Sequence, residues 1–181
     1  PYSTQDWRAE IVAVDDDFAT STPVESTTNV DLLGLLAFAL DDLEIAYGAI
    51  EPGSDTGTLS ASTTMRATGN VGIDQELEGH SMCPTYSSTT PCNASATSTI
   101  PASEQKYGTS SVAYSSPLAY VLSSTTIQEL ELDVLKSVAT SSQESKETYW
   151  GIAIPGSITL SGDYFGQNTF YARIGEPAAW Y

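Results

Sequence analysis

The sequence predicts an all-β protein whose strands form an antiparallel sandwich. Three observations predict it: short segments alternate apolar and polar residues, turn residues such as glycine and proline separate these segments, and no helical period is sustained. The chain has 181 residues, which is enough for one domain with a buried core. Short strands separated by turns in a chain of this size are typical of a jelly-roll or immunoglobulin-like β-sandwich.

The first fifty residues combine two kinds of pattern. Residues 7–14 alternate and end in β-branched side chains, which predicts a strand, and the aspartates at positions 15–17 end it. The leucines that follow suit a short helix near residues 31–39. Residues 42–47 alternate again and favour a strand.

The rest of the chain has the pattern of strands joined by turns. Strands are expected over residues 59–68, 71–77, 127–135, 149–154 and 168–174. Residues 78–116 form a long excursion rich in serine, threonine and proline, where we expect only short strands. We therefore predict an N-terminal strand at residues 1–14, available for donation to a neighbouring molecule, and a single sandwich domain over residues 15–181.

The chain is strongly acidic. It carries 23 acidic and 6 basic residues, for a formal net charge of −17. Such a surface repels phosphate backbones and anionic lipid headgroups but attracts multivalent cations, so we expect no nucleic-acid partner. The longest apolar stretch, residues 32–40, contains Gly34 and is too short to cross a bilayer. Direct membrane insertion is therefore not expected either.

Two cysteines predict a disulfide. Cys83 and Cys92 enclose a short polar loop with a proline beside each cysteine. Zinc knuckles use shorter gaps and a second ligand pair, so a disulfide that closes a surface loop is expected, and it implies an oxidising compartment. Asn93 begins an Asn-Ala-Ser sequon and is a glycosylation candidate. Together with the scarcity of lysine, these features predict a secreted protein that is extracellular, at a cell surface.

No motif predicts an enzyme or a cofactor. Asp55-Thr56-Gly57 matches the aspartic-protease triplet, but its Pro-Gly-Ser lead-in favours an exposed turn, and the chemistry needs a second carboxylate. His80 is the only histidine, and no nucleophile elbow accompanies it. We therefore expect a non-enzymatic protein.

Acidic clusters offer oxygen ligands of the kind that calcium prefers. Asp15, Asp16 and Asp17 follow the first strand, and Asp41 and Asp42 lie further along the chain. Their spacing does not match an EF-hand loop. Two interpretations stay open: a solvated acidic turn, or calcium bound at Asp15, Asp16 and Asp17, where it would screen the repulsion between copies of this acidic chain.

Aromatic residues occur at both ends of the sequence, where exposed tryptophan is unusual. The ends either pack on their own domain, or the N-terminal segment inserts into the sheet of a neighbouring molecule and adds a strand. Under the second interpretation, the assembly residues are Tyr2, Trp7, Ile11 and Val14.

Three stretches together resemble a known kind of protein: LEIAYGAIEPG at residues 43–53, ATGNVGID at residues 67–74, and YWGIAIP at residues 149–155 running on to GDYFGQNTF at residues 162–170. The pattern is similar to secreted β-sandwich proteins of uncultivated bacteria and archaea, and more loosely to TasA-like biofilm-fibre subunits. That resemblance covers residues 43–174. It implies donor-strand complementation along a filament, and the leucine-rich residues 32–40 have no counterpart in it.

These observations support two functions. The first is a structural subunit of an extracellular filament, pilus-like fibre or surface coat, whose partners are other copies of itself. The second is a cell-surface adhesion or carbohydrate-binding module, whose partners are glycans stacked on tyrosines of the long excursion and the residues just after it. Those tyrosines are Tyr86, Tyr107, Tyr114 and Tyr120, and ordinary packing is the alternative interpretation for them.

Overall fold

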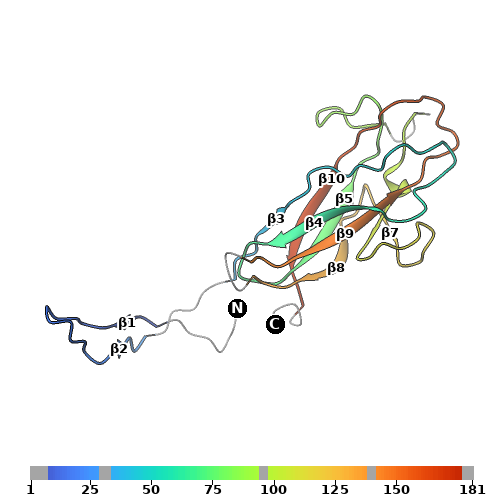
Figure 1. The fold of residues 1–181 in the computed structure, drawn as a ribbon. Coiled ribbons are helices and arrows are strands. Elements are labelled where there is room, and N and C mark those ends of the chain that lie inside the picture. The colour runs from blue at the N-terminus through green and yellow to red at the C-terminus, as the bar shows by residue number, and fades with distance from the viewer. Residues whose placement is uncertain (1–7, 29–33, 94–97, 138–141, 177–181) are drawn as a thin grey trace. The chain divides into compact units, whose positions relative to one another are not determined.

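The computed structural model describes residues 8–28, 34–93, 98–137 and 142–176, and nearly all of its regular structure is β (Figure 1). Its strands are β1 (Glu10–Ile11), β2 (Val24–Glu25), β3 (Phe38–Leu40), β4 (Ala61–Ala67), β5 (Ile73–Gly79), β6 (Gln105–Gly108), β7 (Tyr120–Val121), β8 (Gln128–Val134), β9 (Ser145–Ile152) and β10 (Asn168–Ile174). Among the described residues, the only helical element is the 3-10 turn η1 (Ala102–Glu104). The strand pairs are antiparallel, so the predicted all-β fold is confirmed.

The chain divides into two compact units, Pro1–Leu35 and Leu36–Tyr181. In the first unit, β1 pairs with β2 to form an antiparallel hairpin. Every buried core residue that the structure describes lies in the second unit. The division falls between Leu35 and Leu36, and β1 has its partner strand β2 within the N-terminal unit. Donation of residues 1–14 to a neighbouring molecule stays a prediction.

The second unit contains two sheets that pack face to face through an aromatic cluster. One sheet has the order β10-β5-β8, and the other has the order β3-β4-β9-β6-β7. The indole ring of Trp150 on β9 lies 5.5 Å from the ring of Tyr107 and 5.8 Å from the ring of Phe170 on the opposite sheet. Trp150 also donates its ring N–H to the hydroxyl of Thr63 at 2.9 Å, so this buried polar group is satisfied.

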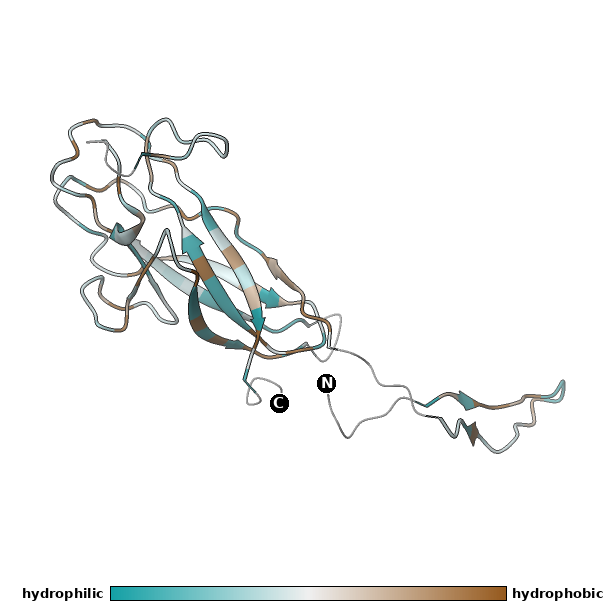
Figure 2. Cartoon of the chain, turned by 180° about the vertical axis from the view of Figure 1, so that it is seen from behind, coloured by the Kyte–Doolittle hydropathy of each residue, from teal (hydrophilic) through white to brown (hydrophobic). Residues whose placement is uncertain are grey.

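The alternation of the sequence determines which side chains face the core. On β8, Leu130, Leu132 and Val134 are buried, whereas Glu129 and Glu131 are exposed. Figure 2 shows this change between hydrophobic and hydrophilic residues along the strands. Removal of each such aliphatic side chain from water contributes about 1.5–3 kcal/mol, which stabilises the sandwich in this strand register.

One polar pair is buried between the two sheets. The hydroxyl of Thr148 on β9 donates to the side-chain oxygen of Gln75 on β5 at 2.6 Å, and both residues are fully buried. The amide nitrogen of Gln75 has no hydrogen-bond partner among the described residues. This pair therefore joins the two sheets but leaves one buried donor unsatisfied, which costs free energy.

Two of the predicted elements are wrong. Within the described part of residues 31–39 there is no helix, and Phe38–Leu40 instead forms β3 against β4. Pairing with β4 packs Phe38 and Leu40 against the core, and an isolated helix of this length is marginal in water. Residues 42–47 belong to no strand; of their alternating side chains, Ile45 and Tyr47 pack against the core, whereas Leu43 is exposed.

The strands predicted from residue 59 onward are confirmed within a few residues of their ends, as β4, β5, β8, β9 and β10. The excursion at residues 78–116 contains the short strand β6, the turn η1 and isolated bridges, as expected. At the N-terminus, the predicted strand is reduced to β1, with a single bridge from Val14 to Thr20.

Candidate functional site

A groove of about 1020 Å³ opens along one side of the sandwich. One wall is the segment at residues 43–50, and the opposite wall is formed by residues 158–168 together with Phe170. Its floor includes the buried side chains of Ile100 and Ile152, so the groove is apolar at its base. A groove of this size is at the upper end of the range for small-molecule pockets.

The first wall, residues 43–50, makes no backbone hydrogen bond to any described residue. The last such bond before it joins the Asp41 amide to the Thr64 carbonyl at 3.1 Å. Along this wall Ile45 and Tyr47 are half-buried, whereas Leu43 lines the groove with 92% of its surface exposed. The wall therefore resembles a strand in its side-chain pattern but has no partner strand to satisfy its backbone groups.

Tyr47 fixes this wall to the floor of the groove. Its hydroxyl donates to the side-chain oxygen of Gln105 at 3.0 Å, and its ring packs against both hydrophobic clusters of the core. Burial raises the pKa of Tyr47 well above its usual value, so the phenol is neutral in the folded protein. One residue later, Gly48 has a left-handed φ of 76°, which turns the backbone at the end of the alternating stretch.

The second wall ends in an open strand edge. Among the described strands, β10 pairs with β5 alone (Figure 1). The backbone groups of Phe165 and Gln167 form hydrogen bonds with Cys83 and His80, which follow β5 in the chain. Backbone groups of an antiparallel strand alternate in direction, so Gly166, Asn168 and Phe170 direct theirs toward the groove. Backbone groups suitable for a further strand thus lie along both sides of the groove.

The N-terminal hairpin presents apolar side chains to solvent. Ile11 is 71% exposed and Phe18 is 86% exposed, and Val14 and Val24 are exposed as well. Ile11 lies opposite Val24 in the hairpin, and an ion pair of 3.3 Å joins Arg8 to Glu25. Of the predicted assembly residues, Ile11 and Val14 are therefore exposed on one short hairpin. Tyr2 and Trp7 lie outside the described residues.

The predicted calcium residues form a turn. One carboxylate oxygen of Asp15 accepts the backbone N–H groups of Asp17 at 3.1 Å and Ala19 at 2.8 Å, as in a solvated acidic turn. Asp16 is exposed beside them, and the three aspartates do not form a close set of carboxylates. In this turn, backbone donors already occupy one oxygen of Asp15. Calcium binding at Asp15, Asp16 and Asp17 stays a prediction.

The second aspartate pair, Asp41 and Asp42, is held by hydrogen bonds within the sandwich unit. Asp41 accepts the Arg66 guanidinium, which lowers the pKa of Asp41, and Asp42 accepts the Thr64 amide at 3.2 Å.

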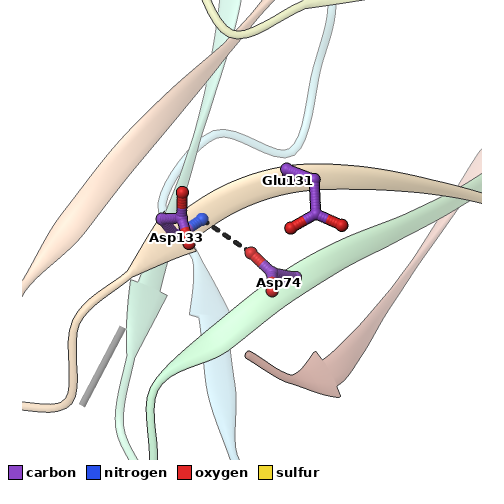
Figure 3. Close-up of side chains that lie close together, drawn as sticks. All are labelled: Asp74, Glu131 and Asp133. Atoms are coloured by element: carbon purple, nitrogen blue, oxygen red, sulfur yellow. Dashed lines mark hydrogen bonds between the residues drawn. The ribbon is translucent and has the colours of Figure 1, made fainter. Parts of the chain in front are cut away.

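Three other carboxylates meet on the outer face of the three-stranded sheet (Figure 3). One oxygen each of Asp74, Glu131 and Asp133 lies within 4.8 Å of the others. Asp74 is buried and accepts the Asp133 backbone N–H at 2.7 Å, and the charge of Asp74 is the main reason that the pKa of Glu131 is raised. Carboxylate oxygens are calcium ligands, but calcium takes six or more, so these three alone make an incomplete set.

The disulfide is present as predicted. Cys83 and Cys92 are bonded, with a Cα–Cα distance of 5.7 Å. The backbone of Cys83 also pairs with Phe165, so the disulfide loop is attached to the second wall of the groove. Asn93 beside it is exposed, as modification requires, and its glycosylation stays a prediction.

The tyrosines proposed for sugar binding are mostly engaged in packing. Tyr107 is fully buried and stacks on Tyr120 at 5.8 Å, and only Tyr120 of that pair is exposed. Tyr114 donates its hydroxyl to the Glu104 carbonyl at 2.9 Å, and Tyr86 donates to Gln167 at 2.7 Å. These contacts match the packing interpretation and do not gather the four rings into one stacking surface.

The two candidate catalytic residues lie in ordinary exposed surroundings. Asp55 accepts the Gly57 backbone N–H at 2.6 Å within a turn, as expected from its lead-in sequence. His80 is exposed, and its backbone pairs with Gln167.

Comparison with protein-family models, with curated proteins and with solved structures finds no match for this chain. Among the described residues, no helix has the length and apolar character needed to span a membrane. Function is therefore proposed from the geometry and chemistry of the chain itself.

Proposed function

We propose that this protein is a structural subunit of an extracellular filament, pilus-like fibre or surface coat, and that neighbouring subunits assemble by exchange of a β-strand. The observation that carries the proposal is the N-terminal hairpin, whose two strands have two residues each and expose Ile11 and Val24, with Val14 exposed in the isolated bridge beyond β1. A two-stranded hairpin is at best marginally stable in water. Burial of these side chains against another subunit stabilises the segment and joins the subunits.

The rest of the molecule suits such a role. The second unit has its own core, so the N-terminal unit is not needed to fill it. The disulfide between Cys83 and Cys92 supports an oxidising, extracellular location. The net charge of −17 opposes close packing of copies, so assembly is expected to require screening by salt or divalent cations.

Negative-stain electron microscopy tests the proposal. The full chain and a chain lacking residues 1–28 are compared, each with and without millimolar calcium and at two sodium chloride concentrations. We expect ordered polymers from the full chain alone, favoured by the cations. Dispersed monomers from both chains under every condition would contradict the proposal, and they would favour the adhesion or carbohydrate-binding module instead.

A further inference from the structure

We propose that the groove between residues 43–50 and the outer edge of β10 is the acceptor site for an extended strand from a second copy of this chain, and that residues 8–14 are that strand. This inference rests on the proposed function and adds the surface where the strand binds. The groove and the hairpin belong to different units of the chain.

The backbone chemistry of the groove selects a polypeptide. Residues 43–50 have backbone groups without a described partner, and the alternation of β10 directs those of Asn168 and Phe170 toward the same space. An extended strand offers N–H and C=O groups along both of its edges, so it satisfies both walls at once. Its side chains on one face meet the apolar floor at Ile100 and Ile152.

The length of the groove matches the proposed strand. β10 lines the groove only at Asn168 and Phe170, whereas the first wall, residues 43–50, lines it throughout. At about 3.3 Å per residue that wall spans at most about 26 Å. Residues 8–14 are one residue shorter, and the turn at Asp15 follows them directly, so the segment is long enough to lie along most of the wall and short enough to end there.

The side chains of the segment suit an apolar groove with an acidic rim. Side chains of a strand alternate between faces, so Ile11 shares one face with two alanines at positions 9 and 13, and this face is entirely apolar. Arg8 and Glu10 cancel, which gives residues 8–14 a formal charge of zero in a chain of −17. The groove is lined by Asp42, Glu44 and Asp163. A neutral strand with an arginine at one end enters this rim without the repulsion that other parts of the chain would meet.

Residues 8–14 make few contacts within their own hairpin, so few are lost when the segment leaves it. Two residue pairs join β1 to β2, and all residues of both strands are exposed. Beyond these pairs, the segment accepts the backbone N–H groups of Ser21 at Ala13 and of Ser26 at Ala9, donates the Ala13 N–H to the Ser21 hydroxyl, and makes the exposed ion pair between Arg8 and Glu25. In the groove the same segment has an open edge on each side and an apolar floor beneath it.

Cysteine pairing between two full-length copies tests the inference. One copy carries Ala46→Cys in the first wall, and a separately tagged copy carries Glu10→Cys, Val12→Cys or Val14→Cys, whose side chains share one face of the strand. We expect one of the three positions to give at least tenfold more disulfide-linked heterodimer than the other two, because a strand in register brings one position opposite residue 46. The matched control replaces Ala46→Cys by Leu118→Cys, which is exposed outside the groove.

Equal linkage at all three positions would overturn the inference, and so would linkage to Leu118→Cys as strong as to Ala46→Cys. A chain that carries both substitutions is a further test: a disulfide that forms only within this chain, and never between two copies, would also overturn the inference. A synthetic peptide of residues 8–14 should compete with the favoured linkage, and a scrambled peptide should not. Polymers that require residues 1–28 but show no linkage at the groove would leave the proposed function standing and sink this site. Linkage at the groove with peptide competition, but without polymers, would support this site and contradict the proposed function.

Discussion

Leu43 offers a sharp test, because it is an exposed side chain that the folded subunit does not need. It lines the groove with 92% of its surface in water. It is two residues before Ile45 and four before Tyr47, which pack against the core. A strand in the groove would bury it, and full burial of a leucine contributes about 1.5–3 kcal/mol. Leu43→Ser is therefore expected to raise the concentration needed for assembly by roughly tenfold to a hundredfold.

The same substitution should leave the single subunit unchanged. A replacement at an exposed position typically alters the free energy of unfolding by less than about 0.5 kcal/mol. The assays are pelleting of polymers over a concentration series and thermal unfolding of the dissociated chain. Leu118→Ser is the matched control, because Leu118 is 66% exposed and does not line the groove. An equal shift in both variants, or no shift in Leu43→Ser, would contradict burial of Leu43 by a strand in the groove.

Three further predictions concern the sandwich itself. Thr148→Val leaves the buried amide of Gln75 without its remaining partner, so it should cost about 1–3 kcal/mol in urea unfolding. Adding Gln75→Met should recover most of that loss, and a purely additive pair would be evidence against the bond. Replacement of Cys83 and Cys92 by serine should lower the free energy of unfolding by roughly 2–3 kcal/mol, since it opens a short loop, and an unchanged value would contradict this. Neighbouring carboxylates raise the folded-state pKa of Glu131, so the folded chain binds that proton more tightly than the unfolded chain, and stability should fall as pH rises through this pKa. Glu131→Gln should flatten that part of a pH series of unfolding measurements, and an unaltered slope would count against the cause given.

The sequence could predict the strands of the second unit, because a period of two residues shows which side chains are buried. On β8, the buried Leu130 and Leu132 are the residues that the alternation indicated. The same rule misled at residues 42–47. Alternation there correctly predicted that Ile45 and Tyr47 pack inward, but it carries no information on whether a neighbouring strand supplies hydrogen bonds.

The candidate site was harder to predict because it depends on pairing between distant segments. Both groove walls belong to stretches that carried a sequence signal, but nothing local places residues 43–50 opposite Phe170. The meeting of Asp74 with Glu131 likewise depends on the register of β5 on β8, which shifts between Ile73 and Gln75. The hairpin was missed because Val24 stands alone among serine, threonine and proline residues, so β2 has no alternation to reveal it.

Assembly through the N-terminal segment is tested most directly by sedimentation velocity of the full chain beside Ile11→Asp, over a range of concentrations in physiological salt. Ile11 contacts a second subunit in the proposed assembly, so a carboxylate at this position should cost free energy only in the assembled state. We predict large species from the unaltered chain that grow with concentration, and a monomer of unchanged shape from Ile11→Asp. The same distribution of species from both chains would contradict assembly through the N-terminal segment.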